Sequence, residues 1–148
     1  MMFSKRSRYG IRALIDLAEN AACGSIQLSE VADRNGISVK YLEQIFASLR
    51  KTDIIRSTKG PQGGYSLARP PEHIKIEDVL AVLEGSCFLE AEEALIDGKG
   101  ETEAHAVQTE IIEPVNGWIA RFFSTLTLKK LVESSEKQKN TAQNMYYI

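Results

Sequence analysis

The sequence predicts a mainly α-helical protein with one small β-hairpin. Apolar residues recur every third or fourth position over most of the chain, which is the period of helices that bury one face against a core. The exception is residues 54–68, where two short apolar runs flank the loop TKGPQGG. Proline and glycine let the chain reverse there, so this segment is expected to form the hairpin.

Length and composition limit the possibilities. The 148 residues suit one small domain with an appendage, and they can bury a proper core. No apolar run approaches the roughly 20 residues that a membrane helix needs, and the start MMFSKRSRYG lacks the apolar segment of a signal peptide. The two cysteines, Cys23 and Cys87, cannot build a disulfide framework. We therefore expect a cytoplasmic protein with reduced thiols.

The net charge of −2 conceals two halves of opposite sign. Residues 1–75 carry 12 Lys and Arg against 7 Asp and Glu, whereas residues 76–148 carry 6 against 13. A basic half joined to an acidic half suggests two roles, and only the basic half is suited to face a polyanion.

Two short helices with a turn between them are predicted at residues 28–35 and 38–50, after a first helix at 8–20. Gly36 suits the left-handed conformation that ends a helix, and the hydroxyl of Ser38 suits the N-cap of the next one. This order predicts a helix-turn-helix.

The hairpin completes a recognisable arrangement. Strands are expected at 54–57 and 65–68, and a further helix at 74–85 packs beside them. A helix-turn-helix followed by a hairpin is a winged helix, so residues 1–85 are predicted to form a winged helix-turn-helix DNA-binding domain. The loop KGPQGG lacks the Gly-Lys-Ser/Thr ending of a nucleotide-binding loop, which makes that alternative weak.

The helix at 38–50 has two distinct faces. Its apolar stripe consists of Leu42, Ile45, Phe46 and Leu49, and the same spacing shifted by two residues places a second row about 200° away: Lys40, Glu43, Gln44 and Ala47. In a major groove, Lys40 can donate to guanine or phosphate, Glu43 can accept from cytosine, and Gln44 can pair with adenine. The alternative is a merely solvated face, but the adjacent hairpin and positive charge favour DNA.

Other polar side chains are expected to contact phosphates and fix the register on the duplex. Ser38 and Tyr41 belong to the same helix, and Gln62 lies at the tip of the hairpin. The positive charge comes from the beginning of the chain and from the hairpin: Lys5, Arg6, Arg8, Arg12, Arg56 and Lys59.

Several stretches resemble the Rrf-two family of bacterial winged-helix transcription regulators: RYGIRALIDLA, YLEQ, GPQGGY, EDVLAVLEG and STLTLKKLVES. The resemblance implies a homodimer that binds a palindromic operator through the helix 38–50 and a wing at 59–64, usually as a repressor. It carries DNA contacts onto Ser38, Lys40, Tyr41, Glu43, Gln44 and Lys59. No nucleophile–base pair or metal-ligand spacing supports an enzyme.

Cluster-binding members of this family place three cysteines after the helix that ends in LEG, in a segment corresponding here to the acidic loop 86–103. This sequence has only Cys87 there, and one thiolate cannot hold an iron–sulfur cluster. Glu90, Glu92, Glu93 and His105 are conceivable substitutes. We expect no cofactor, a mobile loop, and packed thiols at Cys87 and Cys23; an iron–sulfur or redox-sensing regulator is the alternative.

Residues 104–134 are predicted to form the dimerisation region. Apolar side chains recur there at helical spacing: Val107, Ile111, Val115, Trp118, Ile119, Phe122 and Phe123. Pro114 either opens a second helix or kinks one long helix. In the family, a helix at this position forms the dimer interface, and we expect all of these residues from Ile111 onward to contribute.

The tail at 135–148 is polar as far as Asn144 and then ends in Met145, Tyr146, Tyr147 and Ile148. Polar composition is typical of a disordered terminus. The apolar ending, however, resembles that of family members that control cysteine metabolism, which implies that it enters the substrate cleft of cysteine synthase (O-acetylserine sulfhydrylase). The tail could instead pack on its own dimer, or the chain could be an enzyme-regulating subunit without DNA binding.

Overall fold

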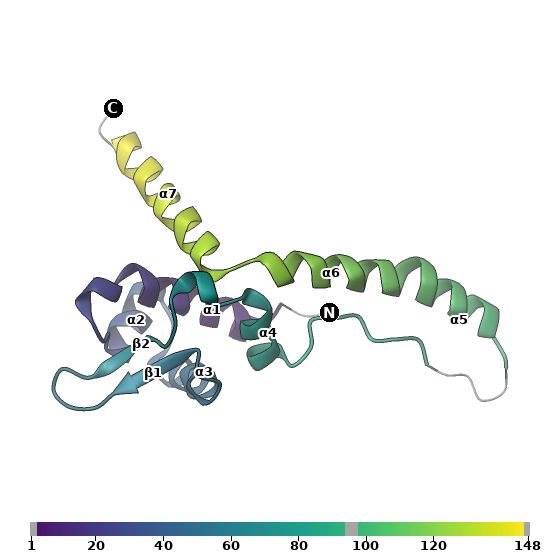
Figure 1. The fold of residues 1–148 in the computed structure, drawn as a ribbon, viewed down its shortest axis with the longest axis horizontal. Helices are drawn as coiled ribbons and strands as arrows, with labels where there is room; N and C mark the ends of the chain where they lie inside the picture. The colour runs from purple at the N-terminus through teal and green to yellow at the C-terminus, as the bar shows by residue number, and fades with distance from the viewer. Residues whose placement is uncertain (1–2, 94–97, 147–148) are drawn as a thin grey trace.

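A helical body carries two projecting helices in the computed structural model, which describes residues 3–93 and 98–146 (Figure 1). The body contains α1 (Lys5–Glu19), α2 (Leu28–Asn35), α3 (Val39–Lys51) and α4 (Ile76–Glu84) around a two-stranded sheet. The projecting part consists of the arm at 101–125 and of α7 (Leu128–Tyr146). The predicted fold, mainly helical with one hairpin, is confirmed.

One continuous core joins the helices of the body. It includes Leu14 and Leu17 of α1, Phe46 of α3 and Leu80 of α4, each at most 1% exposed. Leu128, at the beginning of α7, belongs to the same cluster and is fully buried. Within the part of the chain that the structure describes, no helix combines the length and apolarity needed to cross a bilayer.

The hairpin pairs β1 (Ile55–Thr58) with β2 (Gly64–Leu67) in antiparallel register, Ile55 opposite Leu67. Both strands are displaced by one residue from the predicted spans. The register extends both strands by one residue toward the loop, where Thr58 pairs with Gly64. Outside the hairpin, Ile26 and Tyr65 exchange hydrogen bonds of 2.8 and 2.7 Å, an isolated bridge that joins the segment before α2 to β2.

The arm is one long helical rod built from α5 (Glu101–Val107), the π-helical turn η3 (Gln108–Ile112) and α6 (Glu113–Thr125). Pro114 lies at the beginning of α6, directly after the π-helical turn. Proline has no N–H to donate, and a π-helical turn absorbs such a missing hydrogen bond. Each predicted alternative is therefore partly right. Pro114 lies in the first turn of α6, as predicted for a second helix, but α6 continues the rod without a break, as predicted for one long helix.

Two side-chain amides fasten the preceding loop to this rod. The Leu89 N–H donates to Asn116 Oδ1 at 2.8 Å, and Asn116 Nδ2 donates back to the Leu89 carbonyl at 3.0 Å. Farther out, the Glu92 N–H donates to Gln108 Oε1 at 3.0 Å. Residues 94–97 of the predicted mobile loop lie outside the described residues, and the part from Glu101 onward is helical.

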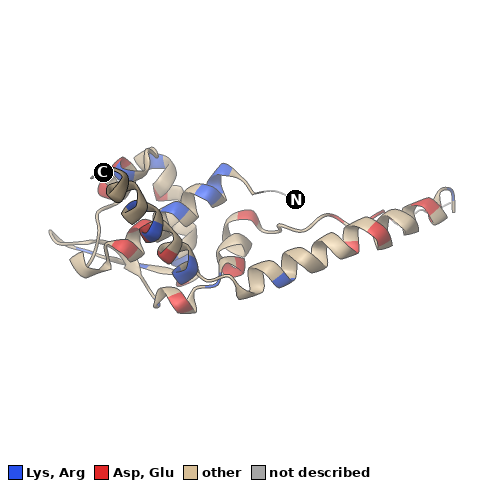
Figure 2. Cartoon of the chain, turned by 90° about the horizontal axis from the view of Figure 1, so that it is seen from above, with Lys and Arg blue, Asp and Glu red and all other residues tan. Residues whose placement is uncertain are grey.

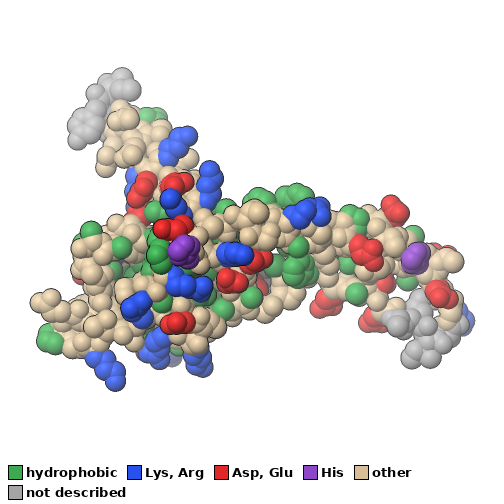
Figure 3. Space-filling model, viewed as in Figure 1, with side chains coloured by type: hydrophobic (Ala, Val, Ile, Leu, Met, Phe, Trp, Pro, Cys, Tyr) green, Lys and Arg blue, Asp and Glu red, His purple; other side chains and the backbone are tan. Residues whose placement is uncertain are grey.

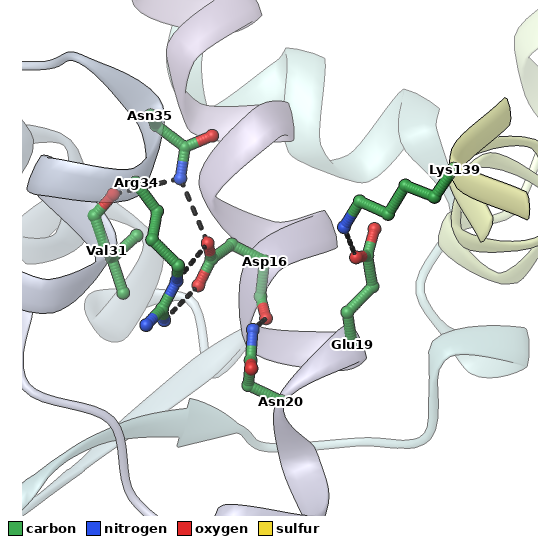
Figure 4. A network of polar contacts seen from close by, with 7 residues as sticks. All are labelled: Asp16, Glu19, Asn20, Val31, Arg34, Asn35 and Lys139. Atoms are coloured by element: carbon green, nitrogen blue, oxygen red, sulfur yellow. Dashed lines mark hydrogen bonds and ion pairs between the residues drawn. The ribbon is translucent and has the colours of Figure 1, made fainter. Parts of the chain in front are cut away.

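The polar run predicted as a disordered terminus is instead helical, since α7 continues to Tyr146. Glu19 of α1 holds it by accepting from Ser135 Oγ at 2.6 Å and pairing with Lys139. One turn earlier on α1, Asp16 accepts from Arg34 at 2.7 and 2.9 Å at the end of α2 (Figure 4). Two carboxylates of one helix therefore tie α1 to both α2 and α7.

A half-buried carboxylate connects the two ends of the body. Glu84, the last residue of α4, accepts from the Ser4 N–H at 2.7 Å and from the fully buried Ser7 Oγ at 2.6 Å. Burial alone would raise the pKa of Glu84, but the hydrogen bonds from Ser4 and Ser7 outweigh it and lower the pKa below its ordinary value of 4.5. The ionised form thus stabilises the folded state.

Replacing this carboxylate by an amide is expected to destabilise the fold in a pH-dependent way. Glu84→Gln should lower the free energy of unfolding by about 1.5–3 kcal/mol at neutral pH, the range of a hydrogen bond to a charged group. Because the folded-state pKa is depressed, this stabilisation is present above the unfolded pKa and is lost as the pH falls through the folded value. Urea denaturation of the parent and the variant, repeated from neutral to acidic pH, measures this difference in the free energy of unfolding.

The exposed Glu90→Gln provides the matched control, because it removes the same charge without a buried partner. A Glu84→Gln protein that is as stable as the control at every pH would contradict the role of this carboxylate.

Candidate nucleic-acid interface

The outward row of α3 lies free on the surface because its opposite row fills the core. Leu42, Ile45, Phe46 and Leu49 are fully buried. Lys40, Glu43 and Gln44 are exposed, and Ala47 is half-buried beside them. The separation of the two faces predicted from the spacing is therefore confirmed.

The turn before α3 fixes where the helix begins. Gly36 adopts the left-handed conformation at φ 63° and ψ 37°, which ends α2 without a side-chain clash. Ser38 caps α3, its Oγ accepting from the Tyr41 N–H at 3.2 Å. The cap uses one lone pair of the hydroxyl and leaves its O–H able to donate to a phosphate.

The hairpin is fixed relative to α3 by an aromatic contact. The Tyr65 ring of β2 meets the buried Phe46 ring of α3 edge-on, with centroids 4.9 Å apart. Gly64 permits a second close approach, of β2 to the segment before α2, since a Cβ there would lie 2.4 Å from the Ile26 carbonyl oxygen. Lys59 and Gln62 are exposed on the loop that extends beyond the sheet. The wing is thus a supported projection next to α3.

The basic residues of α1 and the hairpin differ in how they are held. Lys5 is exposed, while the Arg8 Nε donates to the Phe3 carbonyl at 3.0 Å. Arg56 donates to the Ala68 carbonyl at 2.8 Å and remains exposed. Arg12 donates to the Asn35 carbonyl, so this guanidinium caps the end of α2. Tyr41 is half-buried, and its ring packs edge-on against Tyr9 at 5.9 Å.

Positive and negative side chains are separated in space as they are in the sequence. Figure 2 shows mostly Asp and Glu on the arm and Lys and Arg concentrated on the body. In Figure 3, Lys and Arg side chains gather along the lower edge of the body, where Figure 1 places α3 and the hairpin. The basic surface and the outward row of α3 therefore share one side of the molecule.

Three exposed residues of α3 were missed at the sequence level. Val39 is 46% exposed at the first turn, and Arg50 and Lys51 are exposed at the last. Arg50 and Lys51 lie three and four positions after Ala47, so the spacing that placed the outward row extends to both of them.

The predicted dimerisation residues divide between two faces of the arm. Ile111, Trp118 and Phe122 are 53%, 59% and 46% exposed, and the Trp118 and Phe122 rings stack at 5.2 Å. Val115 is half-buried. The hydrophobic side chains of Figure 3 line the arm along α6.

Ile119 requires a correction, because it is only 2% exposed within its own subunit and cannot present its side chain to a partner. Phe123 is half-buried and packs against the core of the body. These two residues attach the arm to its own chain.

The two cysteines behave differently. Cys87 is half-buried and packs against the core, as expected, where it borders a pocket of about 270 Å³ with Ile119 and Phe123. The packed environment expected for Cys23 is wrong, since the short helix at Ala21–Cys23 leaves it exposed. His73 and His105 are both exposed on the surface.

These features define a winged-helix DNA-binding protein: a capped, anchored helix with a polar outward row, a supported wing, and a basic surface around them. The comparison with known families is consistent with this class. Residues 3–134 match the Rrf2 family, described as iron-dependent transcriptional regulators, and the chain belongs to this family. It is a DNA-binding transcriptional regulator, and the resemblance seen in the sequence is confirmed.

Among the relatives is the HTH-type transcriptional regulator IscR of Klebsiella pneumoniae, 31% identical over 92% of this chain and 82% of its own length. Of the solved structures, CymR, the global cysteine regulator of B. subtilis, has a TM-score of 0.74 at 28% identity and covers 90% of this chain and 98% of its own. IscR of T. potens has a TM-score of 0.61 at 31% identity and covers 93% and 90%.

The iron in the family description raises the question of which residues here would hold it. Cys87 packs against α6, whereas His105 lies farther out on α5 beside Glu92 and Glu93. Across residues 3–93 and 98–146, no group of three His, Cys, Asp or Glu is placed to hold a metal ion. An iron–sulfur cluster ordinarily takes four cysteine ligands, so the donors in this part of the chain do not fit one.

Proposed function

We propose that this regulator is a homodimer that reads a palindromic operator by inserting α3 into the major groove and laying the wing at 59–64 along the neighbouring backbone. The observation that carries the proposal is the exposed row of Lys40, Glu43 and Gln44 on a helix whose other face is completely buried. A helix held so firmly presents its polar side chains in a fixed orientation, which base readout requires.

The contacts separate into those that specify and those that position. Glu43 accepts from cytosine and Gln44 pairs with adenine, while Lys40 donates to guanine or to phosphate. Phosphates are contacted by Ser38 and Tyr41 at the beginning of α3 and by the basic and amide side chains around it: Lys5, Arg8, Arg56, Lys59 and Gln62. Only the contacts to bases distinguish one operator sequence from another.

Truncating Gln44 is expected to relax the recognition of one base pair. Gln44→Ala should cost about 1–3 kcal/mol on the parent operator and broaden the preference at a single position of each half-site. Selection of bound duplexes from a random pool, followed by sequencing, gives the preference of each protein. The exposed Gln143→Ala on α7 is the control, and a Gln44→Ala profile identical to the parent's would exclude direct readout by this helix.

Dimerisation through the arm is proposed because no residue of 3–93 or 98–146 covers its exposed apolar row. Ile111, Trp118 and Phe122 continue the row that begins at Val107, and all four are more than a third exposed. Contiguous aromatic surface of this kind marks protein–protein contact. A two-fold dimer also places two copies of α3 so that they can meet successive major-groove faces of one palindrome.

Trp118→Ala is expected to weaken self-association without unfolding the subunit, since the indole is 59% exposed. Loss of a central aromatic residue from an interface costs on the order of 2–4 kcal/mol. Sedimentation equilibrium measures the dissociation constant, and far-UV circular dichroism verifies the fold. Met145→Ala, which removes a 74% exposed apolar side chain elsewhere, is the control. Equal dissociation constants for the parent and both variants would place the interface elsewhere.

We further propose that the protein represses genes of cysteine or sulfur metabolism in a complex with cysteine synthase. Support comes from the similarity to CymR, the global cysteine regulator of B. subtilis, and from the apolar residues 145–148. Residues 136–145 of α7 are exposed, and this helix extends away from the body (Figure 1). Tyr147 and Ile148 lie outside the described residues, as does the side chain of Tyr146.

Deleting residues 145–148 is expected to abolish binding to cysteine synthase in isothermal titration calorimetry while leaving operator binding by the isolated regulator unchanged. The reason is that the apolar side chains of residues 145–148 provide the area that such a cleft would bury. Lys137→Ala, an exposed change upstream on the same helix, is the control. A truncated protein that binds the enzyme like the parent would contradict the role of the tail.

A further inference from the structure

Arg6 is held differently from the other basic residues of α1. Its side chain is half-buried, and Nη2 donates to Ser48 Oγ at 2.6 Å, which joins the first turn of α1 to the second half of α3. Lys5 and Arg8, its neighbours in sequence, are exposed and make no hydrogen bond to α3 among the described residues. Arg6 alone in this group is fixed against the helix that carries the polar outward row.

Ser48 stands one helical turn after Gln44 and therefore on nearly the same side of α3. Its Oγ also lies 3.4 Å from the Gln44 carbonyl oxygen, which accepts the hydroxyl proton. The hydroxyl accepts from Arg6 on one side and donates to the α3 backbone on the other, so its orientation is determined by two partners. The guanidinium is thereby placed along the flank of α3, next to the end of the outward row.

A second contact keeps α1 and α3 in this relation. Tyr9, one turn after Arg6, meets Tyr41 edge-on at 5.9 Å. The positive charge of Arg6 also contributes to the lowered pKa of Glu84, but no hydrogen bond joins the two side chains in the described structure. Arginine has five N–H donors, and the bond to Ser48 uses one of them. The others suit bidentate binding of a phosphate.

We propose that Ser48 is a positioning residue that holds the Arg6 guanidinium beside α3, where it binds a backbone phosphate at the edge of the groove that Gln44 enters. The inference rests on the proposed insertion of α3 into the major groove. A phosphate contact of fixed geometry sets the register in which Gln44 meets its base, so two residues that touch no base contribute to specificity.

Salt dependence separates a phosphate contact from a structural brace. Binding of the full-length proteins to a fluorescein-labelled duplex of mixed sequence is measured by anisotropy over a series of KCl concentrations. Arg6→Gln should reduce the slope of log K against log salt by about 0.9, the contribution of one phosphate contact. Lys137→Gln on α7, which removes the same charge far from α3, should leave the slope unchanged.

Ser48→Ala tests the positioning role, since it keeps every charge. We expect the salt slope to stay near the parent's and the affinity to fall about three- to tenfold, the effect of one lost hydrogen bond. The exposed Ser134→Ala is the matched control. If Ser48→Ala binds the duplex as tightly as the parent, the positioning role is wrong. If Arg6→Gln has the same salt slope as Lys137→Gln, the phosphate contact is wrong, even where thermal denaturation shows that Arg6→Gln weakens the fold.

The same series distinguishes this inference from the proposed function. If α3 does not face DNA, Gln44→Ala also leaves sequence preference unaltered, and none of the variants differs from its control. If α3 reads DNA but Arg6 is only a brace, Gln44→Ala relaxes specificity while Arg6→Gln keeps the parent's salt slope.

Discussion

Burial of one side of α3 is the constraint on which the reading surface depends. Four side chains of this helix are fully buried, and among them Phe46 packs against Tyr65 of the hairpin. Rotation of α3 about its axis would expose Leu42 or Leu49 and bury a charged residue, and either change costs several kcal/mol. The orientation of the outward row is therefore determined by hydrophobic packing on the far side of the helix. The wing is set by the same contact, so both parts of the interface depend on one cluster.

Local patterns were sufficient to predict the reading half. The two faces of α3, the left-handed Gly36 and the Ser38 cap depend only on residues a few positions apart, and each is found as expected. The pairing of Ile26 with Tyr65 joins segments that are distant in sequence, and local patterns did not predict it. The helical tail was missed for a similar reason, because its partner Glu19 lies more than a hundred residues away in sequence. A polar composition does not reveal such a partner.

The assignment of the arm residues was limited because the whole apolar stripe was treated as one contact surface. Successive residues of a helix lie about 100° apart, so Trp118 and Phe122 form one edge of the stripe and Ile119 and Phe123 form the other. The body covers only the second edge, since Ile119 is 2% exposed whereas Trp118 is 59% exposed. Which edge is covered depends on the contact between α6 and α4, two helices that are distant in sequence, and the composition of the arm does not reveal it.

The family relationship supports conclusions about function more strongly for the residues before Gly85 than for those after it. Before it, the residues proposed to contact DNA lie on an exposed helix face and a supported hairpin, and this geometry supports the use that the family relationship implies. After it, the loop that fixes a metal in cluster-binding members is held here by amides, with Asn116 paired to both backbone groups of Leu89. These hydrogen bonds fasten the loop to the arm with groups that neither oxidise nor release a ligand. The arm and α7 are held in turn by contacts of their own, the burial of Ile119 and the hydrogen bond from Ser135 of α7 to Glu19.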